Sequence, residues 1–216
     1  MEDETILDIS NQRLTTLPGN LPQSLINLYC SENKLTSLPD NLPHNLWHLI
    51  CYNNQLTSLP NNLPQSLKEL WCNNNKLTSL PEHLPPNLKI LYCTGNELIS
   101  LPDKLPQNLI QLMCNNNQLT ILPDLPSSIK FIYLKNNPLD VNYPDIFNFK
   151  NYDNIVTYVN KRNREMRLAR MQKIDPEKRI LELYMKRMMH PSRLAALADD
   201  ADADIDEWMT RYVESL

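Results

Sequence analysis

The chain has 216 residues, of which 42% are hydrophobic, and a formal net charge of -4 at pH 7. This length allows one elongated domain with a small appendage and excludes several large cores. The chain has only two glycines, Gly19 and Gly95, so it contains neither of the phosphate-binding motifs G-x-G-x-x-G and G-x-x-x-x-G-K-[ST]. Nucleotide binding through such loops is therefore excluded. No stretch approaches the roughly 18 apolar residues of a membrane span, and the acidic start MEDETILDIS differs from a positively charged leader. We therefore expect a soluble, non-secreted chain that does not associate with membranes.

Leucines recur every 21 residues over most of the chain, which predicts a solenoid. They are Leu14, Leu35, Leu56, Leu77, Leu98 and Leu119, with Leu139 20 residues later. Each unit reads L-x-x-L-x-C-x-x-N-x-L-x-x-L-P-x-x-L-P. Its first half alternates like a short strand, and its two Leu-Pro steps predict an extended return. Coils stacked in register would form a parallel sheet of about seven short strands.

This pattern resembles leucine-rich-repeat proteins of the short type that is rich in Leu-Pro steps. Similar repeats occur in bacterial secreted effectors and in proteins of large DNA viruses that infect amoebae. The resemblance covers residues 4–140 and implies a horseshoe with a concave parallel sheet, a role in binding proteins, and a viral or bacterial protein that acts on host proteins in the host cytoplasm. In the effectors, such repeats are often joined to a ubiquitin-ligase domain with a nucleophilic cysteine. Because no cysteine follows Cys114, that activity does not carry over, and we expect no enzyme.

The chain is predicted to have two parts. Residues 1–140 form the solenoid, an α/β-type leucine-rich-repeat horseshoe, and residues 141–216 form a C-terminal cap with a helical appendage. Residues 141–160 carry apolar side chains that suit the open end of the solenoid. Helix-start residues and apolar spacing then predict three short helices, at about 176–189, 191–198 and 204–215.

Cysteines and asparagines follow the same repeat. The cysteines are Cys30, Cys51, Cys72, Cys93 and Cys114, and the asparagines are Asn33, Asn54, Asn75, Asn96, Asn117 and Asn137. We expect buried, unbridged thiols, because parallel strands hold neighbouring Cβ atoms too far apart for a disulfide, and such thiols fit an intracellular, reducing compartment. The asparagine amides are expected to bond the backbone of their own and the neighbouring coil. No catalytic motif, metal site or cofactor site is recognised.

Alternation along the strands predicts which side chains face outward on the concave sheet. If Leu28 and Cys30 point inward, Tyr29 points outward. The predicted protein-binding residues are Tyr29, Trp47, His48, Ile50, Glu69, Trp71, Tyr92, Gln111, Met113 and Tyr133. These residue types dominate binding hot spots, and a large exposed apolar surface is unusual on a protein that binds nothing. Cross-strand packing that only stabilises the sheet is one alternative, and self-association of two copies is another.

The C-terminal third has a basic stretch followed by an acidic one. Residues 151–198 carry 11 Lys and Arg against 5 Asp and Glu, whereas residues 199–216 carry 7 Asp and Glu against one Arg. The basic segment 161–187 is the candidate for nucleic-acid binding, but its charges spread around the helical wheel without an aromatic stacking platform. A solvated linker, or a contact with the acidic tail, is the preferred interpretation. A further alternative is an adaptor whose C-terminal helices recruit a ubiquitin ligase.

Overall fold

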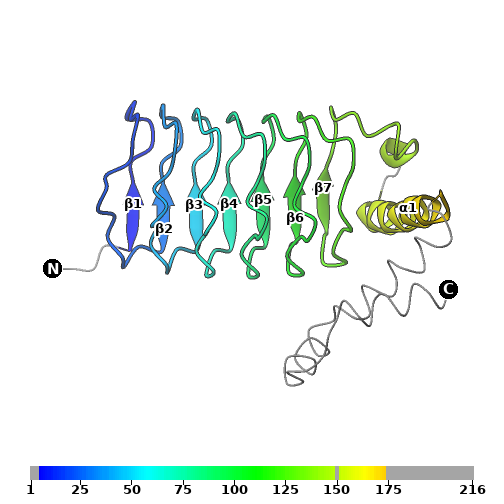
Figure 1. Cartoon of the computed structure of the whole chain (residues 1–216). Coiled ribbons are helices and arrows are strands. Elements are labelled where there is room, and N and C mark those ends of the chain that lie inside the picture. The colour runs from blue at the N-terminus through cyan, green and yellow to red at the C-terminus, as the bar shows by residue number, and fades with distance from the viewer. Residues whose placement is uncertain (1–4, 149–150, 174–216) are drawn as a thin grey trace, which may run out of the picture. The chain divides into compact units, whose positions relative to one another are not determined.

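The computed structural model describes residues 5–148 and 151–173. Within these ranges, seven parallel strands form one sheet in chain order (Figure 1). They are β1 (Ile6–Asp8), β2 (Asn27–Tyr29), β3 (His48–Ile50), β4 (Glu69–Trp71), β5 (Ile90–Tyr92), β6 (Gln111–Met113) and β7 (Phe131–Tyr133). A 3-10 helix, η1 (Ile146–Asn148), and an α-helix, α1 (Tyr152–Lys173), follow. The predicted solenoid with about seven short parallel strands is confirmed, and the three predicted helices beyond residue 175 lie outside the described residues.

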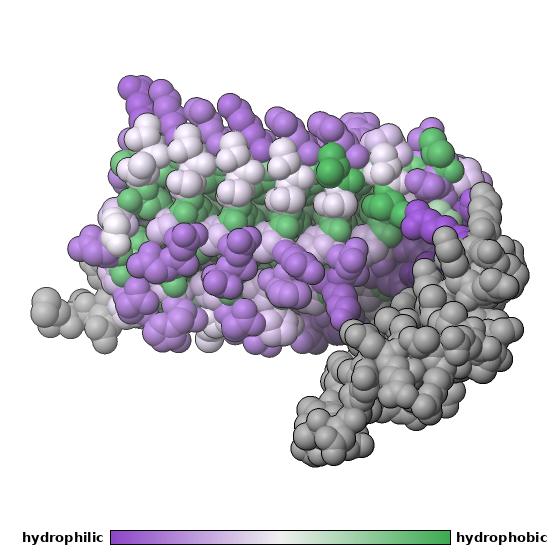
Figure 2. Space-filling model, viewed as in Figure 1, coloured by the Kyte–Doolittle hydropathy of each residue, from purple (hydrophilic) through white to green (hydrophobic). Residues whose placement is uncertain are grey.

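The strands pair without slippage, so equal positions of the repeat stand side by side. Leu28 lies opposite Leu49 and Leu49 opposite Leu70, and at the last step Leu112 lies opposite Ile132. Figure 2 shows the consequence on one side of the molecule, where side chains of similar hydropathy form rows that run across the coils.

The core is a stack of leucines that no single coil could enclose. In the second coil Leu25, Leu28, Cys30 and Leu35 are fully buried, and the same positions are buried in the coils that follow. Burying one leucine side chain contributes about 2 kcal/mol, and that burial requires the coil above and the coil below. The fold therefore depends on stacking rather than on the stability of an individual repeat.

All five cysteines are free and buried. Burial raises the pKa of the Cys30, Cys72 and Cys114 thiols from 9.0 to about 12. The pKa values of Cys51 and Cys93 are also raised, first by burial and then by the neighbouring cysteines. A cysteine attacks electrophiles or binds metals as the thiolate, and the raised pKa values keep these thiols protonated. The five side chains therefore act in the core as small apolar groups.

A buried asparagine closes the bend after each of the strands β2 to β7. The side-chain amide of Asn75 donates to the carbonyl oxygens of Cys72, in its own coil, and Cys51, in the preceding coil, both at 3.1 Å. Its Oδ1 accepts from the Leu56 N–H at 2.9 Å, also in the preceding coil. Equivalent bonds to both coils are made by Asn33, Asn54, Asn96, Asn117 and Asn137.

The first half of α1 packs against the last coil through both apolar and amide side chains. Apolar residues after β7 are buried there, namely Tyr143, Ile146, Ile155, Val156 and Val159. Asn160 bonds both backbone groups of Leu125, accepting at 2.7 Å and donating at 2.8 Å. Asn163 donates to the Leu122 carbonyl at 3.0 Å and accepts from the Tyr143 hydroxyl at 2.5 Å. Backbone groups that a further coil would have bonded are thus satisfied by side chains.

Part of the predicted basic linker is helical instead. Residues 161–173 belong to α1, which continues without a break from the residues that cover the last coil. Arg162 and Asn163 contact the backbone of Asn142 and Leu122, so the helix is held there rather than being a free linker, whereas residues 164, 165 and 167–170 are exposed, as expected for a solvated segment. Residues 174–187 of the basic segment lie outside the described ranges.

Replacing Asn75 with alanine should lower the free energy of unfolding by about 2 kcal/mol, because the Leu56 N–H loses its partner in the core and the Cys51 and Cys72 carbonyls each lose one of two donors. Urea titration followed by circular dichroism would measure the change. Asn73→Ala is the matched control, since the Asn73 side chain is half-buried and has no hydrogen-bond partner in the described part of the chain, and it should cost less than about 1 kcal/mol. Equal effects of the two substitutions would contradict this role of the asparagine.

The cysteine pKa values predict that stability falls in alkali. Well below pH 9 each thiol is protonated in both states, whereas as the pH rises through about 9 toward 12 the unfolded chain loses protons that the folded chain retains, which favours unfolding. The urea midpoint should therefore decline as the pH rises above 9. Cys72→Ala should weaken this decline while lowering stability at pH 7, and an unchanged pH dependence in that variant would be evidence against the assignment.

Asn163→Ala should destabilise the protein by about 2 kcal/mol, because the Leu122 carbonyl and the Tyr143 hydroxyl lose a buried partner. Limited proteolysis should then cut more quickly near residues 122–125. Lys161→Ala, on the exposed side of the same helix, is the control and should change the unfolding midpoint little. If both variants unfold like the parent chain, Asn163 does not secure the last coil.

Candidate functional site

Three columns of side chains cross the sheet on the side opposite the leucine core, and we call them the strand face. In strands β2, β4, β5 and β6 the middle residue is buried, whereas the first and third are partly exposed. The first column is Ile6, Asn27, His48, Glu69, Ile90, Gln111 and Phe131, and the second is Asp8, Tyr29, Ile50, Trp71, Tyr92, Met113 and Tyr133. The third lies two residues further along the chain and consists of Ser10, Ser31, Tyr52, Asn73, Thr94, Asn115 and Lys135.

Hydrogen bonds connect members of the third column across neighbouring coils. The Ser31 hydroxyl lies 3.1 Å from the Ser10 hydroxyl, and the Thr94 hydroxyl donates to Asn115 Oδ1 at 2.7 Å. The strand face is therefore broader than the three-residue strands beneath it.

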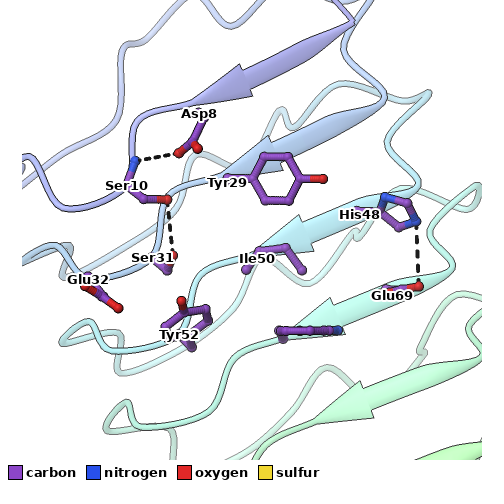
Figure 3. Close-up of a pocket in the computed structure, with 10 residues that line it drawn as sticks. Asp8, Ser10, Tyr29, Ser31, Glu32, His48, Ile50, Tyr52 and Glu69 are labelled. Atoms are coloured by element: carbon purple, nitrogen blue, oxygen red, sulfur yellow. Dashed lines mark hydrogen bonds and ion pairs between the residues drawn. The ribbon is translucent and has the colours of Figure 1, made fainter.

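Over β1 to β4 the strand face is hollowed, with a volume of about 520 Å³ (Figure 3). The figure shows the labelled side chains spread over four neighbouring coils, on the strands and on the loops that follow them. The lining of the hollow combines acidic, aromatic and hydroxyl groups from four coils, namely Asp8, Ser10, Tyr29, Ser31, Glu32, His48, Ile50, Tyr52, Glu69 and Trp71. No lysine or arginine is among them.

The hollow carries negative charge with little compensation. His48 Nε2 lies 3.8 Å from Glu69 Oε1, too far for a short ion pair, and Asp8 accepts a hydrogen bond from the Ser10 N–H at 3.0 Å. The Glu32 side chain has no hydrogen-bond or ion-pair partner in the described part of the chain. The site can therefore attract a cation.

Beyond the hollow, over β4 to β7, the strand face is aromatic. The Trp71 and Tyr92 rings are 5.0 Å apart, and the Tyr92 hydroxyl donates to Gln111 Oε1 at 2.5 Å. Burial, and after it the Glu69 carboxylate, raises the pKa of Tyr92, so its hydroxyl remains a neutral donor. Tyr133 is 45% exposed and lies 6.1 Å, ring centre to ring centre, from Tyr152 of α1.

The structure brings half of the predicted binding residues together in the hollow and aligns others beside it. Tyr29, His48, Ile50, Glu69 and Trp71 line the hollow. The remaining strand-face residues among those predicted, which follow one another over β5 to β7, are Tyr92, Gln111, Met113 and Tyr133.

Two of the predicted residues differ from what strand alternation suggests. Ile50 belongs to the outward column but is only 7% exposed, and its partners in register are the large side chains of Tyr29 and Trp71. Trp47 immediately precedes β3 and lies outside the three columns. It is 43% exposed, and the Lys68 Nζ atom is 3.2 Å from its ring centre.

Sequence reasoning missed part of the hollow. Ser10, Ser31, Glu32 and Tyr52 lie after the strands rather than within them. The sequence does indicate that Ser10, Ser31 and Tyr52 face outward, because each lies two residues after the outward residue that ends its strand. Glu32 has a left-handed backbone conformation with φ of 55°, and the signal for it lies in the repeat rather than in Glu32 itself. The equivalent residues of the other coils are asparagine or glycine, namely Asn11, Asn53, Asn74, Gly95, Asn116 and Asn136.

The described part of the chain also bears on membrane and metal binding. Among its helices, none combines the length and the apolar character needed to cross a bilayer. The same residues contain no group of three or more His, Cys, Asp or Glu side chains arranged to hold a metal ion.

Comparisons with known proteins agree with the geometry. Residues 65–107 match the family model described as leucine-rich repeats in two copies. YopM from Yersinia enterocolitica WA-314 is 40% identical over 58% of this chain and 27% of its own, with a TM-score of 0.55. InlP from Listeria monocytogenes is 28% identical over 56% of this chain and 37% of its own, with a TM-score of 0.52.

A structure described as YopM, a leucine-rich effector protein from Yersinia pestis, is 31% identical over 62% of this chain and 49% of its own, with a TM-score of 0.49. The chain thus spans half or less of the length of these proteins. No curated protein matches it. The stacked strands, the matched repeat model and the two structures with TM-scores above 0.5 together show that the protein has the leucine-rich-repeat fold, with repeats that resemble those of YopM from Yersinia enterocolitica.

Proposed function

We propose that this protein is a non-enzymatic module that binds another protein through its strand face. The observation that carries the proposal is the continuous run of partly exposed aromatic and apolar side chains on β4 to β7, from Trp71 to Tyr133. Aromatic residues supply large contact areas at a small cost in conformational entropy, and they dominate binding hot spots.

The backbone beneath these side chains is fixed before any partner arrives. Each strand is held by its neighbours and by an asparagine that bonds two coils, as Asn96 does with Cys72 and Cys93. A preordered surface loses less entropy on association than a flexible one. This supports recognition by a rigid platform.

Packing within the sheet does not account for all of the outward aromatic residues. Trp71 and Tyr92 contact each other, but Phe131 and Tyr133 at the end of the sheet are 44% and 45% exposed. Stabilisation of the stack comes from the leucines and asparagines on the other side. The exposed aromatic area is thus available to a partner, and a second copy of the chain is one such partner.

The likeness to YopM supports the proposal that the protein acts on host proteins in a host cytoplasm, as a bacterial or viral protein would. No specific observation in the described ranges favours nucleic acid. Within the basic segment, Arg162 donates to the Asn142 carbonyl and pairs with Glu165. The adaptor hypothesis, with recruitment of a ubiquitin ligase, rests on helices that lie outside the described residues.

Trp71→Ala/Tyr92→Ala should reduce capture of the partner from host-cell lysate by at least about tenfold, because two stacked hot-spot side chains are removed. Quantitative mass spectrometry of the captured proteins would measure the reduction. The matched control is Ile99→Ala/Val141→Ala, which removes two exposed apolar side chains, 62% and 81% exposed, that lie outside the strand face.

Both variants must first show the circular dichroism spectrum and urea midpoint of a folded chain. The same proteins captured in equal amounts by the parent chain and the strand-face variant would refute the proposal. A dimer of the parent chain that dissociates in the strand-face variant, measured by light scattering, would identify a second copy as the occupant.

A further inference from the structure

We infer that the hollow over β1 to β4 binds an arginine side chain on an extended segment of the protein partner. This inference rests on the proposed function, because the hollow is part of the same strand face. It adds the chemistry of the group that the acidic end of that face recognises.

Charge is the first support. Asp8, Glu32 and Glu69 line one hollow from three different coils, and because β1 and β4 lie three strand spacings of about 4.8 Å apart, these carboxylates set the charge of the hollow together without converging on one point. In the described ranges, none of the three lies within ion-pair distance of a lysine or arginine, and only His48 approaches Glu69. Walls of low dielectric around carboxylates of one sign strengthen the attraction for a cation. A basic group is therefore the complement of this hollow, and an acidic segment would be repelled.

The aromatic lining selects a flat cation. Tyr29, Tyr52 and Trp71 line the same hollow as the carboxylates. A guanidinium group stacks on aromatic rings and at the same time directs its N–H donors in its plane toward carboxylates. The ammonium of lysine is more strongly hydrated and offers no plane to stack. Spaced carboxylates between rings thus fit arginine better than lysine.

Polar atoms without a partner also lie near the hollow. Asn27 Oδ1 and Trp71 Nε1 are buried and have no hydrogen-bond partner in the described part of the chain. Asn27 lies opposite His48 in the sheet, and both His48 and Trp71 line the hollow. A buried donor or acceptor without a partner is rare and costly. Both atoms are covered by the chain itself, so a ligand reaches them only where the covering side chains move aside.

The test uses the full chain and a blocked hexapeptide of alternating glycine and arginine, with a peptide carrying citrulline for arginine as its uncharged isostere. Isothermal titration should show at least about tenfold tighter binding of the arginine peptide. Glu32→Gln and Glu69→Gln should each weaken it by about three- to fivefold, and salt should weaken it further. Glu97→Gln, which removes the same charge from an exposed position outside the hollow, should leave it unchanged.

Equal affinity for the citrulline peptide, no detectable binding of the arginine peptide, or equal effects of Glu97→Gln and Glu32→Gln would overturn the inference. The capture experiment then separates its failure from failure of the proposed function. If an Asp8→Asn/Glu32→Gln/Glu69→Gln variant captures the partner as well as the parent chain does, while Trp71→Ala/Tyr92→Ala does not, the strand face binds protein without an arginine in the hollow. If both variants capture it normally, the strand face is not the binding surface.

Discussion

The register of the coils is the constraint on which every other feature of the molecule depends, and the inward asparagines enforce it. Each amide bonds its own coil and the preceding one, so a one-residue shift between strand and asparagine would break bonds in both. The sixth coil shows where variation is allowed. It is one residue shorter, but the missing residue lies in the return around Leu122 and Leu125, and Asn137 still bonds Cys114 at 2.9 Å and Leu119 at 3.0 Å.

Because the inward side chains fix the backbone, the residues of the strand face can vary. Stability comes from leucine, cysteine and asparagine columns whose members are almost identical, whereas the first outward column changes from Asn27 through His48 and Glu69 to Phe131. Side chains there tolerate substitution because the backbone beneath them is fixed by other residues. A solenoid with an invariant core and a variable outer face is well suited to recognition, since the surface can be altered without altering the fold.

Much of the solenoid could be predicted because the same residue types recur at the same positions in every repeat. Strand positions follow from alternation, and burial of the thiols follows from their place beside leucines. What could not be predicted depends on contacts between unlike parts of the chain. Ile50 is enclosed because its neighbours in register happen to be Tyr29 and Trp71, and Asn163 reaches Leu122 across 41 residues of sequence. The left-handed backbone at Glu32 is not marked by glutamate itself, but the asparagines and the glycine at the equivalent positions of the other coils do mark it.

The strand face has a direction, and Trp71 is where its two halves meet. Toward β1 the tryptophan lines the acidic hollow, and toward β7 it begins the aromatic run through its contact with Tyr92. A partner segment with a basic group at one end and apolar groups at the other would fit this gradient in one orientation only, because reversal places its cation beside Lys135, away from the carboxylates of the hollow, and its apolar groups among those carboxylates. Recognition on this sheet would thus select the order of residues along a partner as well as their kind, which a uniformly apolar surface cannot do.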